Sequence, residues 1–261
     1  MLRNMCWLCA AVFAATSVVR AGDDEIKNVD QIIKKYIEAI GGRAKLDSVK
    51  SMRWTGKSMF QGGMEAPLTM EFKRPGKLRI DFTFQGMTGT QAFDGETGWG
   101  IMPFMGKTDP EKMSADQVKQ IKDQADMDGP LVDYAKKGHK VENMGLDDIE
   151  GTSAYKLKVT RKDGEVEYHF LDKEYFIPVA IKRKHKFQGT EIGFEVLMSD
   201  YKEVSGVMYP HSVKQRAGSG PGGSTLTIDK IEVNVDLPDA RFAMPEVKKD
   251  TPKAAEKEGD E

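Results

Sequence analysis

The feature that most constrains this chain is an alternation of apolar and polar residues with a period of two. Between positions 66 and 84 an apolar residue stands at every second place, except across the turn sequence Pro75-Gly76. Successive side chains of a strand point to opposite faces, so this spacing gives each strand one apolar face. The segment therefore predicts two antiparallel strands joined by a tight turn.

The same alternation recurs along most of the chain and is interrupted by a helical stretch. Further strands are predicted over 54–60, 90–93, 99–105, 140–144, 154–160, 166–171, 178–184, 190–201, 208–215 and 224–235. Asp163-Gly164, between two of them, is typical of a hairpin turn. The total is about eleven or twelve antiparallel strands. A closed barrel of that many strands has a lumen too wide for its own side chains, so helices are expected in its mouth.

Two stretches have helical spacing instead. From Val29 to Ile40 apolar residues recur every three or four positions, and Gly41-Gly42 ends the pattern. Helical spacing returns between 114 and 134 and predicts two short helices lying across the sheet, one on each side of Gly129-Pro130. The residues of this stretch that we expect to face the sheet are Val118, Ile121, Leu131 and Tyr134.

The first 21 residues have the pattern of a secretory signal peptide. Arg3 precedes an apolar run over 5–19, and Val19-Arg20-Ala21 places small residues where a signal peptidase reads the chain. We therefore expect export to the periplasm, cleavage after Ala21 and a single domain over 22–245. Residues 246–261 are rich in charge and have almost no apolar content, which predicts a disordered tail.

Cysteine content and charge exclude several classes of protein. Cys6 and Cys9 both fall inside the predicted signal peptide, so disulfides, thiolate metal sites and thiol catalysis are not expected in the mature chain. Without Arg3 and Arg20 the basic residues fall from 39 to 37 against 41 acidic ones, a net charge of about −4. No nucleic-acid partner is expected at that charge.

The histidines do not form a recognisable site in the sequence. They are His139, His169, His185 and His211. No two have metal-ligand spacing on a helix, and none belongs to a known nucleophile motif. Each is expected to be a solvated surface side chain. The sequence therefore predicts no metal, no cofactor and no catalytic residue.

Methionine and phenylalanine supply much of the apolar content in the first half of the chain. One interpretation is an ordinary core. The other is a binding surface on one face of the sheet, because Met adapts to varied partners, with residues 114–134 as a lid over it. In the second interpretation the binding residues are Met70, Phe72, Ile80, Phe82, Phe84, Trp99, Met102 and Phe104.

Several short motifs, in this order, resemble the outer membrane lipoprotein-sorting, or LolA-like, group of proteins. They are Ile40-Gly41-Gly42 followed by Lys45-Leu46 and a strand around Trp54, the run from Lys73 to Arg79, Phe93-Asp94-Gly95 with Trp99, and Leu237-Pro238-Asp239 with Phe242 and Pro245. The resemblance implies an unclosed antiparallel β-barrel, mainly β, whose concave apolar face is covered by helices. It also implies a lid held by an arginine, for which the candidates are Arg53, Arg74 and Arg79.

The resemblance further implies a periplasmic carrier or binding protein for the acyl chains of lipoproteins or other lipids. An alternative is a periplasmic sensor module of the same fold that binds a regulatory protein, and an enzyme is the least favoured interpretation. We expect a monomer, with membrane-bound donor or acceptor proteins as further partners. Because cargo moves from one apolar environment to another, a modest change in the lid can decide loading or release.

Overall fold

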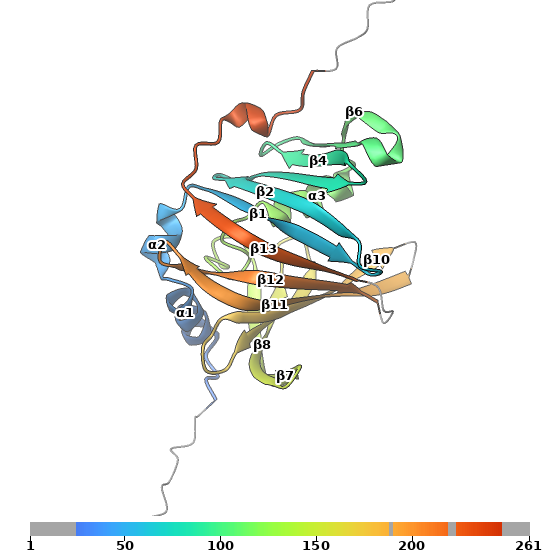
Figure 1. Ribbon diagram of the computed structural model, residues 1–261. Helices are drawn as coiled ribbons and strands as arrows, with labels where there is room; N and C mark the ends of the chain where they lie inside the picture. Colours follow the sequence, from blue (N-terminus) through green and yellow to red (C-terminus); the bar gives the residue numbers. More distant parts are fainter. Residues whose placement is uncertain (1–24, 188–189, 219–222, 247–261) are drawn as a thin grey trace, which may run out of the picture.

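The computed structural model describes residues 25–187, 190–218 and 223–246 (Figure 1). The predicted signal peptide, residues 1–21, lies outside the described residues, as does the predicted tail apart from Glu246. Among the described helices, none is long and apolar enough to cross a membrane.

One antiparallel sheet of 13 strands forms the body of the protein. Its strand order is β6-β5-β4-β3-β2-β1-β13-β12-β11-β10-β9-β8-β7. The strands are β1 Ser51–Phe60, β2 Glu65–Lys73, β3 Lys77–Phe84, β4 Met87–Phe93, β5 Gly98–Met102, β6 Lys107–Lys112, β7 Lys140–Ile149, β8 Thr152–Thr160, β9 Val166–Asp172, β10 Pro178–Phe187, β11 Thr190–Val204, β12 Val207–Ala217 and β13 Gly223–Val233.

β6 is the strand that the period-two pattern did not predict. Its sequence is polar, contains Pro110 and is mostly exposed. It lies at one edge of the sheet, where backbone pairing on a single side suffices and an apolar face is not required. The other strands lie where alternation predicts them, although Pro103–Met105 forms a short 3-10 helix, η1, instead of extending β5.

The sheet consists of two meanders, β1–β6 and β7–β13, which we call the first and second meanders. They are joined because β1 pairs with β13, with Met52 opposite Val233 and Trp54 opposite Ile231. β6 and β7 lie at the two edges, so the curled sheet is not closed (Figure 1). The prediction of an unclosed antiparallel β-barrel is therefore confirmed.

Two helices at the N-terminal side lie at one end of the strands (Figure 1). They are α1 (Val29–Ala39), as predicted, and α2 (Arg43–Ser48). Gly41, between them, approaches the sheet so closely that a Cβ would lie 2.2 Å from the carbonyl oxygen of Gly206, so only glycine fits there. The side chains of α1 that are buried against the sheet are Ile32, Ile33 and Tyr36.

The connection from β6 to β7 packs its apolar side chains into the same core as α1, on the concave side of the sheet. It contains α3 (Ala115–Gln124), which begins at a capping box formed by Ser114 and Gln117. The second helix predicted after it is not present, because residues 127–138 form turns. Gly129 and Asp133 have positive φ angles of 64° and 54°, which a right-handed helix does not accommodate.

The chain after β13 returns along the first meander, where Figure 1 shows it in red. It includes the short 3-10 helix η2 (Asp239–Arg241), and it buries Leu237 and Phe242. Phe242 contacts Trp99, which lies on the face opposite the core formed with α1. The lid therefore lies on the concave face of the sheet and the C-terminal segment on the convex face.

Candidate functional site

Cross-strand pairs decide which side chains share the concave face. Directly opposed residues of an antiparallel pair lie on the same face. Trp54 is opposite Met70, Met70 is opposite Ile80, and Phe72 is opposite Leu78. These five side chains belong to the hydrophobic core that contains the buried residues of α1, or pack against it. The face that they share is therefore the concave one.

Three phenylalanine rings extend this apolar surface toward the hairpin tips. The ring centroid of Phe104, in η1, lies 5.6 Å from that of Phe82 and 5.7 Å from that of Phe84. Gly89, opposite Phe82, leaves room for the cluster, because a Cβ there would lie 2.8 Å from Phe104 and 2.9 Å from Phe82. With half-buried Met102 beside η1, every predicted binding residue except Trp99 lies on the concave face.

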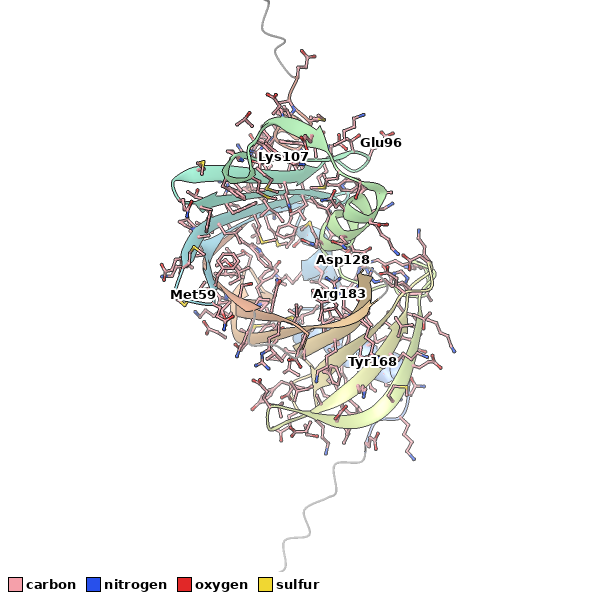
Figure 2. The ribbon with its side chains drawn as sticks, turned by 90° about the vertical axis from the view of Figure 1, so that its right-hand side faces the viewer. Met59, Glu96, Lys107, Asp128, Tyr168 and Arg183 are labelled. Carbon is pink, nitrogen blue, oxygen red and sulfur yellow. The ribbon has the colours of Figure 1, made fainter. Side chains whose placement is uncertain are left out.

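Much of this concave apolar surface is incompletely covered by the described chain. Phe72 is 6% exposed, but six of the predicted binding residues are half-buried: Met70, Ile80, Phe82, Phe84, Met102 and Phe104. The same surface continues across the second meander through half-buried Val196, Met198, Val213 and Leu226. Figure 2 views the curled sheet from the hairpin tips, with α3 on its concave side.

Trp99, predicted to line the site, lies on the convex face instead. It is opposite Ala92, which is opposite Arg79. Its indole N–H donates to the carbonyl oxygen of Phe242 at 2.8 Å, and its side chain is 1% exposed. In β5 Gly98 lies on the concave face, because the pairing register puts it opposite Phe93, and Trp99 next to it points to the other face. Alternation alone does not reveal that register.

The predicted lid residues meet on the concave side. Ile121 and Leu131 are 4% and 2% exposed and belong to the core, and Val118 packs against it. Tyr134 also packs against the core, and its hydroxyl donates to Asp30 at the start of α1 at 2.8 Å. The segment 114–134, which we call the lid, is therefore closed onto the sheet in this structure.

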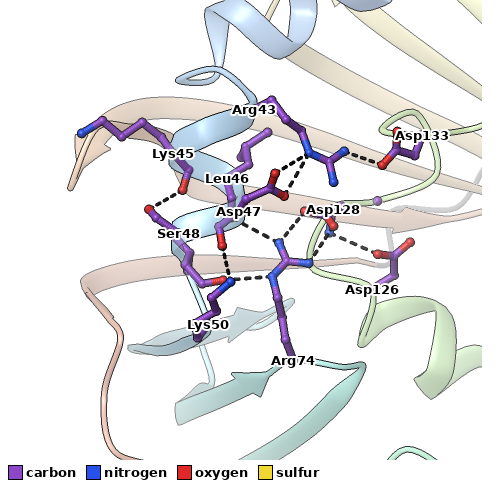
Figure 3. Close-up of polar contacts among 12 residues, drawn as sticks. Arg43, Lys45, Leu46, Asp47, Ser48, Lys50, Arg74, Asp126, Asp128 and Asp133 are labelled. Carbon is purple, nitrogen blue, oxygen red and sulfur yellow. Dashed lines mark hydrogen bonds and ion pairs between the residues drawn. The ribbon is translucent and has the colours of Figure 1, made fainter.

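Arg74, in the turn between β2 and β3, is the predicted arginine that contacts the lid (Figure 3). Its Nη1 and Nη2 atoms donate to the two carboxylate oxygens of Asp128 at 2.7 and 2.5 Å. Its Nε donates to the carbonyl oxygen of Val49 at 2.9 Å, which orients the guanidinium. The hydrogen bonds to Asp128, against the opposing effect of burial, raise the pKa of Arg74.

Arg53 and Arg79 point away from the lid. Both lie on the convex face, where Arg53 Nε donates to Glu71 at 2.9 Å and Arg79 forms a two-bond pair with Asp81. Arg241 of η2 also pairs with Glu71, at 2.6 Å, and Glu71 is 1% exposed. These arginines therefore fasten the C-terminal segment and not the lid.

Charged pairs hold the margins of the lid as well. Arg43 of α2 lies 2.5 Å from Asp133, and Arg161 lies 3.2 Å from Asp123 of α3. Lys119 of α3 pairs with two carboxylates of the β8–β9 turn, Asp163 at 2.8 Å and Glu165 at 2.6 Å. The lid thus combines a small apolar contact surface with several ion pairs around it.

A buried polar cluster lies on the concave face of the second meander. Glu167 and His169 are 6% and 4% exposed, and Glu167 Oε1 lies 2.9 Å from His169 Nε2 and 3.1 Å from Arg161 Nη2. Burial alone would raise the pKa of Glu167. The hydrogen bond with His169 and the charges of His169 and Arg161 outweigh burial and lower that pKa to about 2.

The expectation that the histidines are solvated is wrong for His169 and His211, which are both buried. The neighbours of His169 in β9, Tyr168 and Phe170, pack with a small convex cluster around Ala180. His169 therefore faces the interior, since alternate residues of a strand point to opposite faces. Among the described residues no group of His, Cys, Asp and Glu is arranged to hold a metal ion.

A hollow of about 770 Å³ lies on the other side of the second meander. Tyr168, Lys182, Glu195 and Arg216, opposite one another across β9–β12, line it. Lys182 and Arg216 lie 3.1 and 3.3 Å from Glu195. Its lining combines these charged side chains with Val166 and Phe194, so it differs from the apolar concave surface of the first meander.

The fold is similar to that of several solved proteins, although the sequence matches no protein-family model and no curated protein. A domain from Vibrio parahaemolyticus named for outer membrane lipoprotein sorting has a TM-score of 0.58 and 11% identity, covering 82% of this chain and 97% of that one. A LolA superfamily protein from Nitrosomonas europaea has a TM-score of 0.55 and 14% identity, covering 82% and 96%. A DUF1329 family protein from Desulfovibrio piger has a TM-score of 0.59 and 12% identity, covering 84% and 98%. By this likeness, the chain has the LolA-like fold.

Proposed function

We propose that this protein binds the acyl chains of lipoproteins or other lipids on its concave apolar face and carries them through the periplasm. The observation that carries the proposal is the half-buried state of the concave residues, among them Met70, Ile80 and Phe82. Apolar surface left in contact with water costs about 25 cal/mol per Å², and a contiguous apolar patch commonly marks a binding site. An acyl chain would remove that surface from water.

The lid supports the same proposal. The ion pairs at its margins, among them Arg43–Asp133 and Lys119–Glu165, keep partial contact with water, so water can replace these partners at a cost of about 0–1 kcal/mol each. The two-bond Arg74–Asp128 pair is less exposed and costs more to break. Opening would also uncover Ile121 and Leu131. Bound acyl chains would cover these side chains in the open state, so cargo binding would offset the cost of opening.

We also propose that residues 1–21 direct export and are removed after Ala21. The support is the sequence pattern of that segment. In this proposal the mature protein works as a monomer, exchanges cargo with membrane-bound donor and acceptor proteins, and performs no catalytic step. The intact mass of protein purified from the periplasm gives the N-terminus directly.

The test of binding compares two glutamate variants of the same strand. Phe82→Glu places a charge on the concave face, whereas Thr83→Glu places it on the opposite face. Wild type and both variants are purified from the periplasm, and bound lipid is measured by native mass spectrometry and by extraction. Circular dichroism checks that each is folded.

We expect acylated species bound to wild type and to Thr83→Glu and lost from Phe82→Glu. Wild type that carries no lipid, and also takes up no fluorescent fatty acid, would contradict the proposal. A stable protein partner recovered without lipid would favour the regulatory alternative instead.

A further inference from the structure

Trp54 brings an unpartnered polar group to an otherwise apolar face. Its indole Nε1 is buried and makes no hydrogen bond, a state that no other buried side-chain nitrogen or oxygen shares among the described residues. Buried polar groups in folded proteins nearly always have a partner. Trp99 illustrates the usual state, because its indole N–H donates to Phe242.

The surroundings of Trp54 are aromatic and apolar. Met70 lies opposite Trp54 in β2. The centroid of the Trp54 ring lies 5.2 Å from that of Phe72 and 6.1 Å from that of Tyr209. A neutral tyrosine hydroxyl can accept as well as donate, yet neither Tyr209 nor any other described group accepts from the Trp54 indole N–H. A ligand oxygen would supply the missing acceptor.

We infer that Trp54 makes the concave face select ligands that carry a carbonyl oxygen, the ester or amide of an acylated molecule, over bare hydrocarbon chains. This inference rests on the proposed function. An apolar site that buries an unpaired donor discriminates against ligands that cannot pair with it.

The same position orients the ligand. Trp54 is opposite Met70, four residues before Arg74 along the chain, whereas Phe82 is opposite Leu68 on the side of the hairpin tips, so the carbonyl end lies at the latched end of the concave face. The hydrocarbon end then extends toward Phe82, Phe84 and Phe104 near the hairpin tips. The ligand would thus enter with its carbonyl beneath the lid.

Two ligands of equal length separate the hydrogen bond from apolar contact. Methyl decanoate carries a carbonyl and dodecane does not, and each competes with a fluorescent fatty acid for the protein. We expect Trp54→Phe to weaken the ester by about tenfold more than the alkane, the size of one hydrogen bond. The matched control, Phe82→Leu, loses an apolar contact and should weaken both ligands by the same factor.

Indole N–H signals in proton–nitrogen NMR spectra give a second readout, which uses ligand binding by the wild-type protein only. The Trp54 signal, assigned with Trp54→Phe, should move downfield with methyl decanoate and not with dodecane, while the Trp99 signal stays in place. Equal losses for both ligands, or a Trp54 signal that ignores the ester, would overturn the inference while leaving the carrier proposal intact. If neither ligand binds wild type, the carrier proposal itself fails.

Discussion

The two meanders share one sheet and one alternating pattern, yet their concave faces are covered to different degrees. In the second meander Leu157, Val159 and Leu171 are 0% exposed. In the first, Ile80 and Phe82 stay half-buried. The lid and α1 pack mainly against β7–β9 of the second meander and against the latched end of the first, and they leave the tips of the first meander and several concave residues of β11–β13 half-buried. An alternating pattern thus produces an apolar face, and what packs on it decides how much of that face is removed from water.

The largest expected effect comes from truncating one residue in each meander. Leu157→Ala should lower the free energy of unfolding by about 2–5 kcal/mol, because it leaves a cavity in a filled core. Ile80→Ala should cost about 1 kcal/mol, since its side chain is already in partial contact with water. Urea unfolding measures both. Equal losses would show that the two faces are equally well packed and would remove the contrast.

The second prediction concerns the polar cluster of the second meander. The folded-state pKa of Glu167, about 2, lies below its ordinary value of 4.5, so the ionised carboxylate stabilises the fold above that ordinary value. This stability, about 3 kcal/mol, should be lost as pH falls from about 4.5 to about 2. Unfolding measured across that range should lose much of its pH dependence in Glu167→Gln. Glu203→Gln, an exposed site, should behave as wild type; a wild-type pH profile in Glu167→Gln would contradict the prediction.

The third prediction concerns the latch between the first meander and the lid. Asp128→Asn weakens the two-bond pair with Arg74 and should lower the stability of the lid by about 1–3 kcal/mol. Hydrogen exchange over α3 should speed up accordingly. The control is Asp81→Asn, which breaks an arginine pair on the convex face and should leave exchange in α3 unchanged. If both variants affect α3 alike, Arg74 is not a specific latch.

The smallest expected effect separates the two faces of the first meander. Trp99→Phe removes the hydrogen bond to Phe242 and should cost about 1 kcal/mol of global stability. Affinity for an acyl ligand should not change, because Trp99 lies on the convex face. A loss of ligand affinity as large as that of Trp54→Phe would mean that the C-terminal segment takes part in binding.

Local patterns predicted most of the secondary structure and a smaller part of the site. Alternation located nearly all the strands, because each side chain's face is a local property of the backbone. It missed β6, whose edge position needs no apolar face, and it did not foresee the turns at Gly129 and Asp133. Most predicted binding residues share one face because they occupy alternate positions of adjacent strands, and the pairing places those positions opposite one another.

By itself, the sequence determined that this chain forms a sheet of one-sided apolar strands with helices at two places. The tertiary structure alone decided which face is concave, which arginine pairs with the segment 114–134 and which tryptophan lies on the concave face. These features depend on contacts between distant residues: Arg74 and Asp128 are 54 positions apart, and Trp99 and Phe242 are 143 apart. The physical reason is that strand register and the placement of covering segments arise from packing of the whole chain, which no local period encodes.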